Sequence, residues 1–295
     1  MIELRVVETD AELDLWAGIK STVVPNEPVT AAQLRASDEP GRLLLLADLE
    51  GRPAGCGIAA PSHFGGRAFV AVRVLPGSRR RGVGSALVSA LAAHGRALGR
   101  KDVNAFVYAD EPHSIAFAES YGLAQADYQL EQVREIGAER APVAPAGAEL
   151  VPLGGRRVEL LRAAWPLALE GYADLPLPDE ASYELETWLR DEATRPEGSF
   201  VALEGEAVVG YAGLLEHADG PAIAEHGLTV VRRDRRARGI ARALKQAQLH
   251  WAAEAGVARL VTWTQRGNEA MQSLNRSLGY LDQSKVITFQ GPLPG

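Results

Sequence analysis

The feature of this sequence that most constrains its fold is an internal repeat. The segment Arg79–Leu87 reads RRRGVGSAL, and Arg236–Leu244 reads RARGIARAL. The same offset of 157 residues (239 − 82 = 157) relates three pairs of glycines: Gly82 and Gly239, Gly99 and Gly256, Gly122 and Gly279. Landmarks that stay in register over this distance indicate a duplicated domain rather than two helices of similar composition.

Length and composition suggest where the two copies meet. The chain has 295 residues, of which 46% are apolar, which suits two domains of about 140–150 residues, each with its own core. Between them, Gly137–Glu149 is rich in Pro, Ala and Gly and lacks apolar periodicity, which is typical of a connector. We expect an N-terminal domain at 1–138, a linker at 139–148 and a C-terminal domain at 149–295.

Apolar periodicity predicts a similar order of elements in both halves. The expected strands are Ile2–Val7, Arg42–Ala47, Ala54–Ala59, Phe69–Leu75, Val103–Tyr108, Tyr128–Arg134, Phe200–Leu203, Val208–Leu214, Ile223–Val231, Arg259–Thr264 and Lys285–Phe289. The expected helices are Ala11–Lys20, Gly82–Leu98, Ser114–Tyr121, Arg156–Ala168, Glu180–Arg190, Ile240–Glu254 and Glu269–Ser277. Hairpins beside a strand–helix–strand unit predict an α/β (α+β) fold, with a mixed, mostly antiparallel sheet flanked by helices in each half.

In each half a strand runs into an Arg- and Gly-containing loop and then into a long helix. The start of a helix leaves backbone N–H groups unpaired and carries the positive end of the dipole, so it binds phosphate. Both loops fit Arg-x-x-Gly-x-Gly/Ala, which is neither the nucleoside triphosphatase loop nor the dinucleotide fingerprint. The expected phosphate-binding residues are Arg79, Arg80, Arg81, Gly82, Val83, Gly84 and Ser85 in the first half, and Arg236, Ala237, Arg238, Gly239, Ile240, Ala241 and Arg242 in the second.

With these loops the sequence resembles the GNAT superfamily of acetyltransferases, and the likeness extends to Glu225–Val231 and Asn268–Tyr280. In that family the loop holds the pyrophosphate of acetyl-CoA, and the preceding strand splays from its neighbour to admit the pantetheine arm. The resemblance therefore implies that acetyl-CoA is the co-substrate. It also implies that coenzyme A is contacted by Val74, Thr229, Val230, Val231, Asn268 and Met271.

The two halves differ at positions of chemical interest. At the common offset, Glu225 aligns with Ala68, Asn268 with Glu111, and Asn275 with Ala118. Many members of the family have a tyrosine acid at the position of Asn275, so the resemblance leaves the proton donor to the thiolate open. We expect the first half to be chiefly structural and degenerate, although its loop retains what coenzyme A binding needs.

Acetyl transfer needs a base for the amine and donors for the tetrahedral oxyanion. Glu225 is the first candidate for the base, directly or through water, and His226 is the second; adjacent strand residues face opposite sides, so one of them is expected to face the substrate. A backbone N–H near Val231 suits the oxyanion. Asn275 could contact the thioester sulfur or coenzyme A, or bond local backbone, and an ordinary structural role remains open for all three side chains.

The resemblance also implies a substrate wall between the first two helices of the second half. The segment Tyr172–Asp179 is aromatic and acidic, which suits an amine, and Tyr172 and Asp174 are the expected substrate contacts. Asp179 also suits the N-cap of the next helix.

Charge and cysteine content bound the remaining partners. The net charge of −7 (31 − 38) argues against nucleic acid. Cys56 is the single cysteine, so no intrachain disulfide or cysteine-based zinc site is possible, and no metal is expected. The N-terminus lacks the apolar run of a signal peptide, and no aliphatic run approaches the roughly 20 residues of a membrane span. We expect a cytoplasmic monomer or homodimer without a membrane partner.

The favoured function is transfer of an acetyl group from acetyl-CoA to a primary amine of a small molecule. The tandem arrangement broadly resembles that of mycothiol-synthase-like acetyltransferases, although no motif fixes the same substrate. The alternatives are a non-catalytic protein that binds or senses acetyl-CoA, and a peptide or protein N-acetyltransferase.

Overall fold

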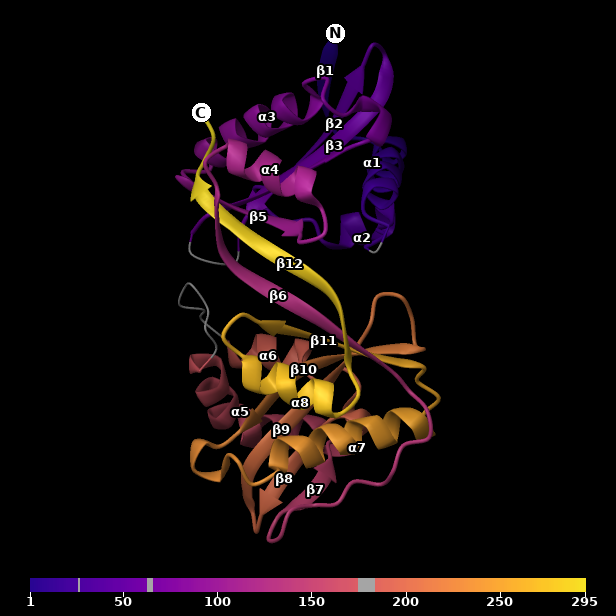
Figure 1. The fold of residues 1–295 in the computed structure, drawn as a ribbon, viewed down its shortest axis with the longest axis vertical. Helices are drawn as coiled ribbons and strands as arrows, with labels where there is room; N and C mark the ends of the chain where they lie inside the picture. The colour runs from indigo at the N-terminus through magenta and orange to yellow at the C-terminus, as the bar shows by residue number, and fades with distance from the viewer. Residues whose placement is uncertain (26, 63–65, 175–183) are drawn as a thin grey trace. The chain divides into compact units, whose positions relative to one another are not determined.

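The computed structural model describes residues 1–25, 27–62, 66–174 and 184–295 (Figure 1). The chain forms two compact units: the first is Met1–Asp127 with Ile287–Gly295, and the second is Tyr128–Val286. The segment 139–148, expected as the linker, lies inside the second unit. Composition could not indicate that the last residues belong with the first unit, because it carries no information on strand pairing. The expected domain boundaries therefore stay a prediction.

The first unit is a mixed sheet with helices on both faces. Its strands are β1 (Ile2–Val6), β2 (Leu43–Leu49), β3 (Arg52–Pro61), β4 (Ala68–Val74) and β5 (Asp102–Tyr108), in that order, with the end of β12 (Leu281–Pro292) following β5. The pairs β1–β2, β2–β3 and β3–β4 are antiparallel, whereas β4 and β5 are parallel. Its helices are α1 (Asp10–Val23), α2 (Ala31–Ala36), η1 (Pro76–Ser78), α3 (Val83–Ala97) and α4 (Pro112–Ser120).

Alternate residues of β3 divide the core of this unit between two layers. Cys56 is buried in the cluster that α1 and α2 form with β2. Its neighbours Gly55 and Gly57 face α3, where an added Cβ would meet Leu87. Because successive strand residues face opposite sides, α1 and α2 cover one face of the sheet and α3 covers the other.

The second unit repeats this plan. Its strands follow the order β6 (Ala124–Glu135), β11 (Arg259–Gln265), β10 (Ile223–Val231), β9 (Ala207–Glu216), β8 (Phe200–Glu204) and β7 (Glu149–Pro152). Only β10 and β11 are parallel among the pairs of this unit that the structure describes. Its helices are η2 (Gly154–Arg156), α5 (Arg157–Ala173), α6 (Leu185–Asp191), η3 (Pro196–Gly198), η4 (Arg233–Arg235), α7 (Ile240–Glu254) and α8 (Glu269–Ser277).

Two neighbouring residues of β10 show how the helices of this unit are layered. Val230 is buried in the cluster of α5 and α6, and Val231 is buried in the cluster that contains the start of α7. The two helical layers therefore lie on opposite faces of the sheet. Helices α7 and α8 lie side by side, joined by the Arg242 guanidinium, which donates to Ser277 Oγ at 2.8 Å (Figure 1).

The sequence repeat is also a structural repeat. Helices α3 and α7 begin 157 residues apart (240 − 83), as do α4 and α8 (269 − 112), β5 and β11 (259 − 102), and η1 and η4 (233 − 76). The predicted α/β class, with two tandem units and mostly antiparallel sheets, is confirmed.

Several element bounds differ from expectation. Helix α5 runs on to Ala173 because its buried stripe continues through Leu167, Ala168 and Gly171. The last strand, Leu281–Pro292, is longer than predicted. Helix α2 and strand β7 are short elements that periodicity did not reveal. The expected helix Glu180–Arg190 is described from residue 184 onward, where α6 begins at Leu185, and its earlier residues lie outside the described chain.

Candidate functional site

Strands β10 and β11 separate partway along their length. They pair in parallel at three positions, from Ile223 opposite Arg259 to Glu225 opposite Val261. On the other side of β10, the register with β9 shifts between His226 and Thr229, which marks a bulge. The splay expected from the family resemblance is therefore present at this point.

A pocket lies where the two strands part. Its volume is about 190 Å³. It is lined by Tyr172, Gly227, Leu228, Thr229, Lys245, Thr262, Trp263, Thr264, Gln265, Asn268 and Met271. Residues from both helical layers contribute, since Tyr172 comes from α5 and Lys245 from α7. The pocket thus lies at the gap in the sheet, in reach of both faces.

A buried carboxyl group supports the bulge. Glu192 Oε1 accepts hydrogen bonds from the Tyr211 hydroxyl at 2.9 Å and from the Leu228 backbone N–H at 3.2 Å. A Cβ on Gly227 would stand 2.1 Å from this oxygen, and one on Gly213 only 1.9 Å from it. Burial raises the pKa of Glu192 to about 7. Glu192 was not predicted from the sequence; the available signal was the glycine in the middle of each of the two strands beside it, Gly213 and Gly227.

The loop before α7 has the backbone geometry that phosphate binding needs. Ala237 and Gly239 have left-handed φ values of 59° and 83°, and no side chain caps the helix start at Ile240. The first backbone N–H groups of α7 therefore remain available to a ligand. In the first unit, Arg80 and Gly82 have φ values of 60° and 86° at the equivalent positions.

The arginines of this loop are used in different ways. Arg236 donates to Val231 O at 3.0 Å and to Asp174 at 2.5 Å, and Arg233 also pairs with Asp174. These two guanidinium groups lower the pKa of Asp174 to about 2. Within the described residues, Arg238 makes no hydrogen bond or ion pair. The expected substrate contact Asp174 thus lies against the loop, paired with Arg233 and Arg236.

The three expected catalytic side chains do not line the pocket. Glu225 is half-buried, and its pKa is raised, first by burial and further by Glu131, while His217 opposes the rise. His226 is buried, with Nε2 at 2.5 Å from the Tyr280 hydroxyl.

Burial keeps the pKa of His226 well below its usual value, and nearby Lys245 lowers it further. Asn275 is fully buried, and its Nδ2 donates to Gln132 Oε1 at 2.9 Å. Their catalytic roles, and the oxyanion donor near Val231, stay predictions.

Other expected residues do come together at the pocket. Tyr172, Thr229, Asn268 and Met271 all line it, although they are far apart in sequence. The expected wall beyond Asp174 lies outside the described residues.

The pairing of parallel strands corrects one comparison between the halves. Ala68 pairs with Val103 and Phe69 with Asn104, whereas Glu225 pairs with Val261, the repeat equivalent of Asn104 (261 − 157 = 104). The expected match of Glu225 with Ala68 is therefore wrong by one residue, because the bulge adds a residue to β10. Phe69 occupies the place of Glu225.

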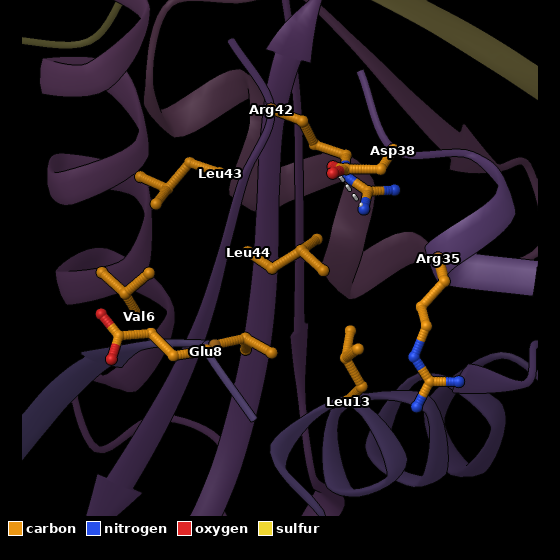
Figure 2. Close-up of a pocket in the computed structure, with 9 residues that line it drawn as sticks. Val6, Glu8, Leu13, Arg35, Asp38, Arg42, Leu43 and Leu44 are labelled. Carbon is orange, nitrogen blue, oxygen red and sulfur yellow. Dashed lines mark ion pairs between the residues drawn. The ribbon is translucent and has the colours of Figure 1, made fainter. Parts of the chain in front are cut away.

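The first unit has a pocket of its own, but away from its loop. This cavity, of about 270 Å³, lies between the end of β1, the start of β2, and α1 (Figure 2). Arg42 crosses one side and pairs with Asp38 at 2.9 Å. None of Arg79–Ser85 lines this pocket, so it is unrelated to the phosphate-binding geometry.

Two features of the described residues bear on a membrane or a metal ion as partner. None of the helices there is long and apolar enough to cross a membrane. No group of three His, Cys, Asp or Glu side chains is arranged there to hold a metal ion.

Comparisons with known proteins agree with the duplicated architecture. The model of the acetyltransferase (GNAT) family matches residues 11–123 and 158–280. A curated mycothiol acetyltransferase of Nocardia farcinica is 30% identical over 268 residues, covering 86% of this chain and 84% of its own.

Two solved structures share the fold over the whole chain. A GCN5-related N-acetyltransferase from Sphaerobacter thermophilus has a TM-score of 0.81 at 19% identity, covering 100% of this chain and 96% of its own. A tandem GNAT protein from the clavulanic acid biosynthesis pathway has a TM-score of 0.73 at 22% identity, with coverage of 100% and 99%.

Proposed function

Because the chain belongs to the acetyltransferase (GNAT) family, we propose that it moves an acetyl group from acetyl-CoA to a primary amine of a small molecule, with the chemistry in the second unit. The observation that carries this proposal is the pocket in the splay of β10 and β11, beside an uncapped helix start. The relatives named mycothiol acetyltransferase support a small-molecule acceptor. Cytoplasmic localisation and a monomeric or homodimeric state stay predictions.

The loop and the splay suit the two ends of acetyl-CoA. The backbone N–H groups of Arg238–Arg242 would hold the pyrophosphate, assisted by the Arg238 guanidinium, which makes no ion pair within the described residues. Asn268 and Met271 from the start of α8 would line the path of the pantetheine arm. The same left-handed geometry at Gly82 supports coenzyme A binding by the first unit as well.

In the proposed reaction the amine nitrogen attacks the thioester carbonyl carbon. A C–N bond forms, the C–S bond breaks, the thiolate leaves, and the nitrogen loses a proton to a base. The raised pKa of Glu225 makes it a stronger base than an ordinary carboxylate, directly or through water. His226 suits the task less well, since it is buried and its Nε2 is engaged by Tyr280. The bond between Asn275 and Gln132 favours a structural role for Asn275, with solvent as the proton source for the thiolate.

The test is turnover of acetyl-CoA with panels of small amines and of peptides, combined with calorimetry of acetyl-CoA binding. Wild type should bind acetyl-CoA and acetylate at least one small amine, and Gly239→Val should lose both, because Gly239 has a left-handed φ that valine does not adopt. Binding without turnover on either panel would indicate a sensing protein, and turnover on peptides alone would indicate a peptide N-acetyltransferase. Unchanged affinity in Gly239→Val would refute the assigned loop.

A further inference from the structure

One cationic side chain in the pocket has no role in the chemistry above. Lys245 lies on α7, is 1% exposed, and lines the pocket in the splay together with Thr229 and Thr262. It is five residues from the first residue of the helix, Ile240 (245 − 240 = 5). That is about 7.5 Å along the axis at 1.5 Å per residue, beyond the turn expected to hold phosphate. Lys245 therefore meets the pocket rather than the phosphate loop.

Lys245 has no counter-ion in the described chain. Its Nζ makes no hydrogen bond or ion pair among those residues, and its one aromatic contact is the Tyr280 ring, with the centroid 5.5 Å away. A ring face attracts a cation but carries no negative charge to neutralise it. Burial lowers the pKa of Lys245 to about 7. Because buried ammonium groups in proteins are normally paired, this site lacks an anion.

The two buried or half-buried carboxyl groups described above, Glu192 and Glu225, do not pair with Lys245. Glu192 Oε1 is held by Tyr211 and Leu228. The charged neighbours that shift the pKa of Glu225 are His217 and Glu131, and Lys245 is not among them. Neither carboxylate therefore serves as the partner of Lys245.

A second polar atom in the same cavity also lacks a partner. Thr229 Oγ1 is buried without a hydrogen bond, at the position where β10 leaves its bulge. A buried hydroxyl without a partner is costly, and a carboxylate would accept hydrogen bonds from both this hydroxyl and the Lys245 ammonium. The unpaired ammonium of Lys245 and the unpaired hydroxyl of Thr229 are thus two independent observations that each favour a carboxylate ligand.

We propose that Lys245 and Thr229 form a carboxylate-binding subsite in this pocket, so that one of the two reactants carries a carboxylate. This inference rests on the proposed function. Acetyl-CoA has no carboxylate on its acyl group, so we assign the carboxylate to the acceptor, a primary amine of the amino-acid type. The other source of the same group would be an acyl donor that ends in a carboxylate.

The experiment compares matched reactants. The acceptor arm measures kcat/KM for 4-aminobutyrate and for n-butylamine with acetyl-CoA. The donor arm compares succinyl-CoA with acetyl-CoA on n-butylamine. Both are run with wild type, Lys245→Met, Thr229→Val and the control Lys285→Met, whose lysine packs on the Tyr128 ring.

We expect wild type to favour 4-aminobutyrate over n-butylamine by at least about tenfold, the scale of a charged hydrogen bond. The ratio should fall to near one in Lys245→Met, fall partly in Thr229→Val, and persist in Lys285→Met. A preference in the donor arm alone, lost in Lys245→Met, would keep the subsite and move the carboxylate to the donor. Turnover without carboxylate preference in either arm, or with a preference that survives Lys245→Met, would overturn the subsite.

A binding readout separates this inference from the proposed function. If no amine is acetylated, the proposed function fails, and the subsite is then judged by thermal unfolding with millimolar 4-aminobutyrate or succinate. A ligand that binds the folded state alone raises Tm. A rise in wild type that is absent in Lys245→Met would support the subsite, and no rise in wild type would overturn it.

Discussion

The contact between Gly227 and Glu192 gives the sharpest test of how the pocket is built. In Gly227→Ala the new Cβ would stand 2.1 Å from Glu192 Oε1 and 2.9 Å from its carboxyl carbon, so the side chain must move. Glu192 is 8% exposed and holds the Tyr211 hydroxyl and the Leu228 N–H. Leaving a buried partner unsatisfied costs about 1–3 kcal/mol, so losing both bonds should lower the free energy of unfolding by about 2–6 kcal/mol.

Chemical denaturation of four variants measures this effect. Gly155→Ala is the control, since nothing lies within 4 Å of its added Cβ, and it should change stability by less than about 0.5 kcal/mol. Glu192→Ala removes the obstructing carboxyl, so Gly227→Ala should cost much less in that background, with a coupling energy of about 1–3 kcal/mol. An equal cost of Gly227→Ala in both backgrounds would refute Glu192 as the reason for the glycine.

Three further outcomes follow from the same structure. Because the pKa of Glu192 is raised from 4.5 to about 7 in the folded state, wild type should lose at most about 3 kcal/mol of stability as pH rises from about 4.5 to about 7. In Glu192→Gln the free energy of unfolding should depend less on pH over this range, and an unchanged dependence would contradict the assignment. Glu225→Gln should lower turnover about 10²–10⁴-fold with acetyl-CoA affinity intact, and wild-type turnover should fall as acid protonates Glu225. Near wild-type rates of Glu225→Gln across pH would exclude Glu225 as the base. Activity should survive Gly82→Val and disappear in Gly239→Val, whereas residual turnover in Gly239→Val that the double variant loses would show that the first unit catalyses.

Much of the fold could be predicted from sequence because its strongest signals are local. Helix α7 was predicted with its observed bounds, Ile240–Glu254, since its buried stripe recurs at helical spacing and Gly239 marks its start. Thr229, Asn268 and Met271, which the family resemblance implied as coenzyme A contacts, all line the pocket.

The missed residues depend on contacts that are distant in sequence. Glu192 follows a short helix and has the sequence context of an exposed residue, and the pairing of β9 with β10 brings Gly213 and Gly227 to its carboxyl group. Lys245 stands among polar residues of α7 and resembles a surface lysine. It is buried because the helix also packs over the splayed strands, and periodicity does not reveal which strands splay.

The corrected register shows at which positions the two copies of the repeat differ. Both units retain left-handed residues two positions apart in the loop, so both retain the geometry of a phosphate site. Two pocket residues differ, since at the common offset Thr229 and Lys245 correspond to Val72 and Val88 (229 − 157 = 72; 245 − 157 = 88). Outside the pocket, Phe69 stands in place of Glu225.

Val88 is 7% exposed, and Phe69 packs on the Phe106 ring with centroids 5.5 Å apart. Apolar side chains there stabilise the first unit without a ligand, whereas the second unit buries a lysine and a threonine hydroxyl that lack partners in the described chain. Lys245 and Thr229 of the second unit therefore carry a cost in stability that a bound substrate would offset. Replacing Lys245 with methionine, or Thr229 with valine, should therefore raise the free energy of unfolding while it lowers the preference for carboxylate-bearing reactants; a loss of stability in both variants would show that these side chains serve the fold.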